Sequence, residues 1–289
     1  MSNLPPHFIA DVRHPRGYPD LDAGQWFQWR SIPLIELSAL DTYQFMKSML
    51  PQPAQTILEV GCGNGYLTLE LARDGHNVIG IDLSADIIEV AERSRAAHPD
   101  PPGFGNLRYL CTDVNTYQAP NASFDTVIFN RALHHMHDLQ QTMATVTRLL
   151  KQGGRIICQD YAYDRFDART ASWLYQMQRL LFLSGHYDAD PATLPSESAS
   201  IEALRTAWLQ RGSEHHLNQY EQMMSALRGT YHEHSFAWVP SLFVYIGNGI
   251  RPVSAEQERE LLTFLKGMEQ YLIDHGAIQA VGVRFVGGV

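Results

Sequence analysis

The chain has 289 residues, of which 45% are hydrophobic and 18% charged, so it can bury a large core and is not expected to be disordered. Its 22 Lys and Arg against 31 Asp and Glu give a net charge of -9, which disfavours a nucleic-acid binder that needs a basic face. No apolar run reaches the ~18 residues of a membrane-spanning helix, the first residues lack the apolar core of a signal peptide, and three separated cysteines cannot form a disulfide framework. We therefore expect a cytoplasmic protein with neither nucleic acid nor membrane as a partner.

Residues 51–160 alternate between short apolar runs and helical stretches, a pattern typical of a parallel sheet with helices on both faces. The strands expected in this block are Thr56–Val60, Asn77–Ile81, Arg108–Thr112, Thr126–Asn130 and Arg155–Gln159. The helices expected between them are Tyr66–Arg73, Ser84–Ala97 and Leu139–Leu150, the last one closed by Gly153 and Gly154.

The flanking parts of the chain are richer in aromatic residues, and all five tryptophans lie there. Residues 164–184 and 198–229 read as helices, whereas 236–246 and 278–286 read as strands on either side of a helix over 255–274. These aromatics are either ordinary helix-packing core or a cap over a ligand cleft. We expect four parts, namely an N-terminal cap segment (1–50), an α/β core (51–160), a helical lid insertion (161–235) and C-terminal strands with a helix that complete the sheet (236–289).

A glycine loop with acidic residues around it is the strongest motif. The run Leu58-Glu59-Val60-Gly61-Cys62-Gly63-Asn64-Gly65 leads from an apolar strand into a helix, and its glycines let the backbone approach a bound molecule closely. The next two strands end in Asp82 and Asp113, and a carboxylate at the first of these positions can accept hydrogen bonds from both hydroxyls of a ribose. The spacing is not the G-x-G-x-x-G of dinucleotide folds, and Glu59 would repel a pyrophosphate. The pattern therefore favours an adenosine-containing cofactor that carries positive charge.

This block resembles the class I S-adenosylmethionine-dependent methyltransferases strand for strand. The resemblance implies a Rossmann-like α/β sheet of seven strands, the last one antiparallel, with a helical cap. It also implies S-adenosylmethionine as cofactor and S-adenosylhomocysteine as product. In that family the glycine loop holds the methionine part, the acid after the second strand binds the ribose, and the acid after the third lies beside the adenine. The cofactor contacts expected here are Glu59, Gly61, Gly63, Asn64, Gly65, Asp82, Leu83, Asp113, Val114 and Asn130.

The fourth strand runs into Asn130-Arg131-Ala132-Leu133-His134-His135-Met136-His137-Asp138, at the edge that would face the methyl group. This segment lacks the Asn/Asp-Pro-Pro-aromatic tetrad of adenine- and glutamine-methylating enzymes, and Asn130 stands where a catechol-type magnesium site needs an acid. The LHHMHD stretch resembles small-molecule methyltransferases, including sugar O-methyltransferases of natural-product pathways, in which the histidine before Met is the base. That resemblance assigns the general base to His135 and expects Asp160, which ends the neighbouring strand, to hold its other ring nitrogen.

Several alternatives stay open at this point. His134 is a second candidate base, and the histidines could instead only cap and hydrogen-bond their loop. The pairs His134/His137 and His232/His234 have no partner acids in the pattern, so we expect no metal site. The leading function is methyl transfer to a small organic acceptor at oxygen. The rivals are a methyltransferase-like cyclase that binds the cofactor without transferring its methyl group, and a non-enzymatic scaffold.

Overall fold

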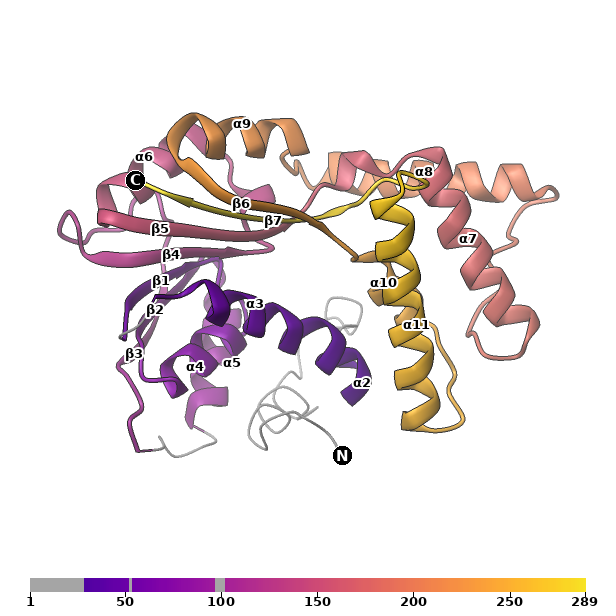
Figure 1. The fold of residues 1–289 in the computed structure, drawn as a ribbon, viewed down its shortest axis with the longest axis horizontal. Coiled ribbons are helices and arrows are strands. Elements are labelled where there is room, and N and C mark those ends of the chain that lie inside the picture. The colour runs from indigo at the N-terminus through magenta and orange to yellow at the C-terminus, as the bar shows by residue number, and fades with distance from the viewer. Residues whose placement is uncertain (1–28, 52–53, 97–101) are drawn as a thin grey trace.

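The computed structural model describes residues 29–51, 54–96 and 102–289, and its centre is one seven-stranded sheet (Figure 1). The strands lie in the order β3-β2-β1-β4-β5-β7-β6, with β1 to β5 parallel and β7 antiparallel to both β5 and β6. The strands are β1 (Thr56–Val60), β2 (Asn77–Asp82), β3 (Leu107–Cys111), β4 (Phe124–Asn130), β5 (Leu150–Tyr161), β6 (His232–Val239) and β7 (Gly282–Gly288). The predicted sheet of seven strands with an antiparallel last strand is confirmed.

Helices cover both faces of the sheet and extend beyond its carboxyl edge (Figure 1). One face carries α3 (Asp41–Met49), α4 (Tyr66–Arg73) and α5 (Ala85–Ala96), with α3 preceded by α2 (Ile32–Ile35) and the π-helix η3 (Glu36–Leu40). The other face carries α6 (Leu139–Leu149) and α9 (Tyr220–Thr230). The helices beyond the carboxyl edge are α7 (Ala168–Leu183), α8 (Glu197–Glu214), α10 (Leu242–Asn248) and α11 (Ala255–Asp274), and the short 3₁₀ helices are η4 (Leu133–His135) and η5 (Tyr163–Arg165).

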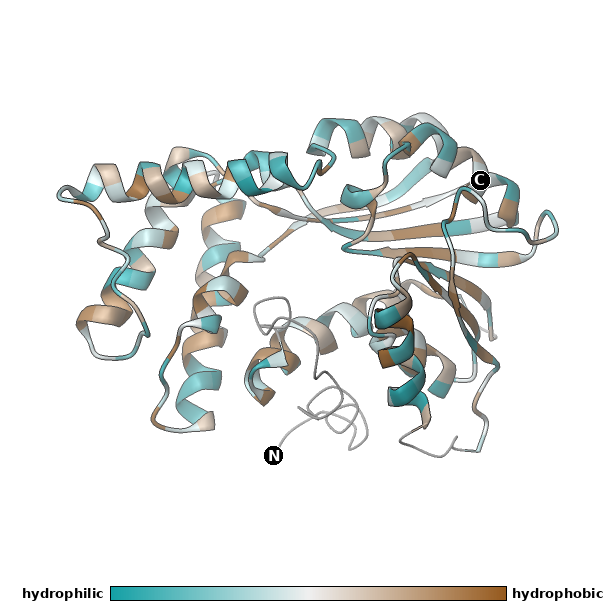
Figure 2. Cartoon of the chain, turned by 180° about the vertical axis from the view of Figure 1, so that it is seen from behind, coloured by the Kyte–Doolittle hydropathy of each residue, from teal (hydrophilic) through white to brown (hydrophobic). Residues whose placement is uncertain are grey.

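The buried apolar residues form three clusters that follow this layering. One cluster lies under α3 and α4, a second under α6 and α9, and a third joins α2, α7, α10 and α11. The central strands are mostly hydrophobic in Figure 2, as expected for parallel strands that are covered on both faces. Within the described ranges, no helix is both long enough and apolar enough to cross a membrane.

Two of the predicted elements are wrong in the C-terminal half. The strand expected over 236–246 ends at Val239, and residues 242–248 form α10 instead. Pro240 cannot donate to a strand ladder, and the buried carboxylate of Glu269 accepts hydrogen bonds from the N–H groups of residues 241, 242 and 243 at 2.8, 2.9 and 2.8 Å. This carboxylate therefore caps the N-terminus of α10. The local sequence pattern had predicted a strand at these residues.

The helix expected over 198–229 is divided into α8 and α9. Residues 215–219 interrupt it, with His216 at φ +51, and the chain then turns to lay α9 along α6 on the sheet. The expected lid boundary is thereby corrected, because α9 belongs to the sheet layer and β6 already begins at His232.

The glycine pair after α6 is also not a helix cap. That helix ends at Leu149, and Gly153, at φ +72, lies within β5 beside a register shift in its pairing with β4.

Candidate active site

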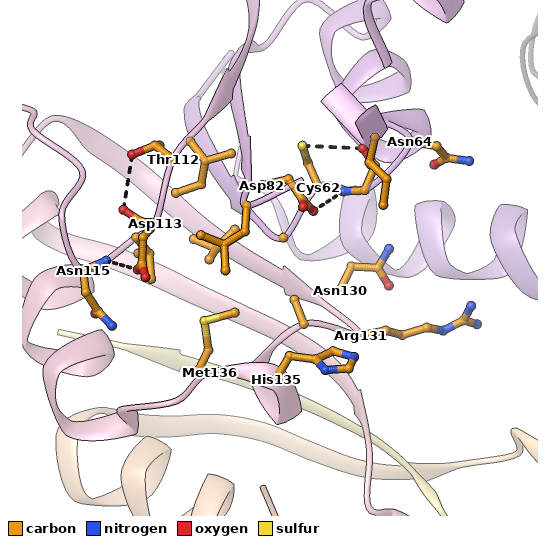
Figure 3. Close-up of a pocket in the computed structure, with 18 of the residues that line it drawn as sticks. Cys62, Asn64, Asp82, Thr112, Asp113, Asn115, Asn130, Arg131, His135 and Met136 are labelled. Carbon is orange, nitrogen blue, oxygen red and sulfur yellow. Dashed lines mark hydrogen bonds between the residues drawn. The ribbon is translucent and has the colours of Figure 1, made fainter. Parts of the chain in front are cut away.

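A pocket with a volume of about 410 Å³ opens at the carboxyl ends of the parallel strands (Figure 3). Its wall comes from the glycine loop after β1, the ends of β2 and β3, and the segment 130–137 after β4. Eight of the ten predicted cofactor contacts line it, namely Gly61, Gly63, Asn64, Asp82, Leu83, Asp113, Val114 and Asn130. All of its lining within the described residues lies between positions 60 and 137, so none comes from the segments predicted as cap. Residues 1–28 of the expected N-terminal cap lie outside the described part of the chain.

All three loop glycines have positive φ, and Gly63 and Gly65 have different roles. Gly63 faces open space, so a bound molecule can come directly against its backbone. A Cβ on Gly65 would lie 2.6 Å from the Tyr109 hydroxyl, and the Gly65 carbonyl accepts a hydrogen bond from that hydroxyl at 2.9 Å. Gly65 does not line the pocket, and it serves close packing of the loop against β3 instead.

Glu59 is the other predicted cofactor contact that does not line the pocket. Its side chain is 1% exposed and accepts a hydrogen bond from Thr68 Oγ1 of α4 at 2.5 Å. Burial, with the nearby charge of Asp82, raises the pKa of Glu59 to about 8 against the opposing effect of Thr68. The structure therefore places Glu59 beneath the loop, where it joins β1 to α4.

Asp82 and Asp113 lie along the pocket where β2 and β3 end. Asp82 accepts hydrogen bonds from the N–H groups of Gly63 and Ser84, each at 3.0 Å, which fixes its carboxylate beside the glycine loop. Asp113 accepts from the N–H of Asn115 at 2.7 Å. Both acids keep further acceptor capacity toward the pocket, since each carboxylate offers about four lone-pair sites.

Two buried polar atoms in the pocket wall indicate that a polar ligand group belongs between them. The Nδ2 of Asn64 and the Oδ1 of Asn130 have no hydrogen-bond partner within the described structure. The Asn130 amide is held in place because its Nδ2 donates to the Tyr66 hydroxyl at 2.9 Å. A donor and an acceptor at this end suit the carboxylate and the ammonium group of an amino acid. The residues present thus fit the methionine part of S-adenosylmethionine.

The histidine turn after β4 differs from the sequence-based expectation. Asp160 contacts Nδ1 of His134, not His135, and its carboxylate also accepts from the N–H groups of Leu133 and Tyr161 at 2.7 Å each. Both His134 and Asp160 are buried, at 6% and 2% exposure. Successive residues of a 3₁₀ turn point about a third of a turn apart, so His134 enters the protein while His135 faces the pocket. The expected pairing of Asp160 with His135 is therefore wrong.

His135 is exposed to the pocket and lies beside His134, with 4.1 Å between ring centroids. Desolvation by the surrounding wall and the neighbouring His134 ring lower the pKa of His135 to about 4, although Asp160 opposes this shift. The imidazole is consequently neutral near pH 7. Met136 and His137 also line the pocket.

Sequence reasoning gave no role to two residues near this turn. Arg131 lines the pocket, and the only local signal for it was its position directly after Asn130. Asn218, in the connection between α8 and α9, donates from its N–H to the carbonyl of His134 at 2.7 Å and from its Nδ2 to the carbonyl of Met136 at 2.6 Å. No sequence signal linked these segments, which are more than eighty residues apart. Across the described ranges, no group of three or more His, Cys, Asp or Glu is placed to hold a metal ion.

Comparison with known proteins agrees with this geometry. A family described as a methyltransferase domain matches residues 58–158. An uncharacterized methyltransferase of Mycobacterium tuberculosis is 34% identical over 111 residues, which are 38% of this chain and 53% of that protein. The demethylmenaquinone methyltransferase of Symbiobacterium thermophilum is 32% identical over 143 residues, 48% of this chain and 50% of that protein. The chain thus matches about half the length of these relatives.

Solved structures share the fold over most of the chain. Geranyl diphosphate C-methyltransferase from Streptomyces coelicolor has a TM-score of 0.55 at 15% identity, covering 96% of this chain and 84% of that one. The [4+2]-cyclase SpnF has a TM-score of 0.53 at 15% identity, covering 87% and 82%. Together these findings identify residues 58–158 as a methyltransferase domain of the class I S-adenosylmethionine-dependent type, as the resemblance implied.

Proposed function

We propose that this protein is an S-adenosylmethionine-dependent methyltransferase that transfers the methyl group to an oxygen of a small organic acceptor. The observation that carries the proposal is the arrangement of one pocket. Asp82, Asp113 and His135 line the same wall, and Asn64 Nδ2 and Asn130 Oδ1 have no partner within the described structure. We assign the two acids to the adenosine and the two amides to the amino-acid part of the cofactor. The curated relatives support this reading, since a ubiquinone biosynthesis O-methyltransferase of Coxiella burnetii is 28% identical over 113 residues, 39% of this chain and 46% of that protein.

The bound cofactor supplies an electrophilic methyl group, and the chain supplies position and proton acceptance. Asp82 holds the ribose of the adenosine part, while the glycine loop with Asn64, and Asn130 after β4, orient the methionine part. Positioning of this kind contributes up to ~7–11 kcal/mol to such a transfer. His135, neutral at pH 7, accepts the proton of the acceptor hydroxyl, and Asp160 supports the turn indirectly by anchoring His134. We further infer action in the cytoplasm, in keeping with three free cysteines, and a place in natural-product biosynthesis.

The direct test begins with calorimetry of the purified protein with S-adenosylhomocysteine and with NAD. The proposal expects micromolar affinity for the first and no binding of the second. Methyl-labelled S-adenosylmethionine is then incubated with the protein and a panel of phenolic and alcoholic acceptors. Labelled product with release of S-adenosylhomocysteine supports transfer. Cyclisation of an acceptor without that release supports the rival cyclase, and tight NAD binding alone overturns both.

A further inference from the structure

A row of three polar residues crosses neighbouring strands of the sheet. Asn130 of β4 lies opposite Gln159 of β5, and Gln159 in turn lies opposite Arg284 of β7. Residues that lie opposite one another in paired strands project from the same face of the sheet. The row ends at Asn130, the pocket residue whose Oδ1 has no partner within the described structure.

The helices α3 and α4, which cover this face of the sheet, add two hydroxyl groups to the row (Figure 1). Thr42 Oγ1 of α3 accepts a hydrogen bond from Gln159 Nε2 at 2.7 Å and donates to the carbonyl of Ser38 at 3.0 Å. The Tyr66 hydroxyl of α4 is hydrogen-bonded to the Thr42 side chain, and it accepts from Asn130 Nδ2 at 2.9 Å. A continuous chain of hydrogen bonds thus leads from Gln159 to Asn130.

The direction of these hydrogen bonds is set at the far end of the chain. A guanidinium can only donate, and Arg284 Nε donates to Gln159 Oε1 at 2.7 Å. The Gln159 amide must therefore turn its Nε2 toward Thr42, whose own proton goes to Ser38. The bond between Thr42 and Tyr66 then needs the tyrosine proton. Burial raises the pKa of Tyr66 to about 12, which keeps that proton in place near pH 7.

The same order decides which atom of the Asn130 amide can meet a ligand. Because the Tyr66 proton points to Thr42, the Tyr66 oxygen accepts, and it accepts from Nδ2 of Asn130. Oδ1 is then the amide atom left for a ligand. An amide turned by half a revolution would offer N–H donors instead, which repel an ammonium group where a carbonyl oxygen attracts it.

We propose that Thr42 is a positioning residue for the cofactor: through Tyr66 it fixes the Asn130 amide with Oδ1 toward the ammonium group of bound S-adenosylmethionine. This inference rests on the proposed function and specifies how the site distinguishes its cofactor from adenosine ligands without that ammonium group. Thr42 does not line the cofactor pocket, so its effect passes through the other side chains.

The test compares two ligands by calorimetry, S-adenosylhomocysteine and its deamino analogue, in which hydrogen replaces the α-amino group. Wild type is expected to bind S-adenosylhomocysteine at least tenfold more tightly. Thr42→Val should reduce this preference to less than threefold, because the Tyr66 proton can then turn to Asn130 and release its amide. Thr42→Ser keeps the hydroxyl and the preference. The matched control Thr126→Val, at a buried threonine of β4 whose hydroxyl has no partner within the described residues, also keeps it.

A double variant separates this role from a general loosening of the site. In Asn130→Asp either carboxylate oxygen can accept from the ammonium group, so the addition of Thr42→Val should leave the preference of Asn130→Asp unchanged. Tyr66→Phe removes the same link in the chain and should also reduce the preference to less than threefold. It decides the question if Thr42→Val binds neither ligand.

The ratio of the two affinities is the informative quantity, since the ligands share the adenosine and the carboxylate. The inference is overturned if wild type binds both ligands equally, or if Thr42→Val or Tyr66→Phe keeps the preference of wild type. It is also overturned if Thr42→Val lowers the preference in the Asn130→Asp background. Failure of wild type to bind S-adenosylhomocysteine at all would instead refute the proposed function.

Discussion

Asp160 bonds to the ring of His134, and this pairing leaves the adjacent His135 ring facing the pocket. Burial would raise the pKa of Asp160, but His134 and the neighbouring backbone N–H groups lower it, so the carboxylate stays ionised inside the protein. Two consecutive histidines thereby acquire different tasks. His134 fixes the turn, and His135 lines the pocket, where the proposed reaction assigns it the acceptor proton.

His135→Ala is expected to lower kcat by ~10²–10⁴, because a base contributes in the transition state, with little change in cofactor affinity. The pKa of about 4 also predicts that the acid limb of the kcat/KM profile lies near pH 4 rather than near 6.5. The measurement is a pH–rate profile with S-adenosylhomocysteine release as readout.

His137→Ala, which removes an exposed histidine of the same pocket, is the matched control for His135 and should stay near wild type. His134→Ala should instead destabilise the fold by about 3–5 kcal/mol, since it leaves the buried carboxylate of Asp160 without its partner. Full activity of both His134→Ala and His135→Ala between pH 6 and 9 would show that neither histidine is a base.

Asp82→Asn is expected to weaken binding of S-adenosylhomocysteine by about 2 kcal/mol, roughly thirtyfold, because the ribose hydroxyls lose a charged acceptor. The change also weakens the hold of this side chain on the N–H of Gly63. Calorimetry gives the affinity, and Asp86→Asn, at an exposed acid four residues further along the chain, should leave it unchanged. Equal affinities for wild type and Asp82→Asn would refute the ribose assignment.

Glu59→Gln should alter the pH dependence of stability rather than cofactor binding. The pKa of Glu59 is about 8 in the folded protein, against an ordinary value of 4.5. Between these values the unfolded chain has released the proton that the folded protein still holds, so this group makes the unfolding free energy fall as pH rises, by about 1.4 kcal/mol per pH unit. The variant should therefore be more stable than wild type at pH 8 and gain little at pH 5.

Denaturant unfolding at both pH values measures this effect of Glu59→Gln. Glu89→Gln, at an exposed acid of α5, keeps Glu59 and should therefore match the stability of wild type at both pH values. A tenfold loss of S-adenosylhomocysteine affinity in Glu59→Gln would show that Glu59 contributes to cofactor binding, as the sequence pattern predicted.

Asn218→Ala should reduce kcat about tenfold or more, because the turn that carries His135 loses the donor to its Met136 carbonyl. We expect a loss of stability of about 1–2 kcal/mol from the carbonyl left without this partner, and unchanged cofactor affinity. Asn106→Ala, which removes an exposed asparagine, is the control. If kcat is unchanged while the stability falls, Asn218 is a structural link only.

The sequence predicted those features that depend on residues close to one another in the chain. The apolar runs that become β1 and β4, the glycine loop and the acid at Asp82 all follow from spacing within a few residues. What it missed depends on contacts between distant segments. α10 forms because Glu269 of another helix caps it, and the His134 turn is held by Asp160 and Asn218, which lie far along the chain. Periodicity carries no information about such partners.

β7 bonds to β5 on one side and to β6 on the other, although α10 and α11 separate it from β6 in the chain. Until β7 is inserted, β6 has no strand to pair with, and β5 ends the sheet with open backbone groups. The pairing of β7 with β6 is thus non-local, and such pairing slows folding. An intermediate that lacks β7 would expose two unsatisfied strand edges at once, so aggregation during refolding should depend on this one strand more than on any other.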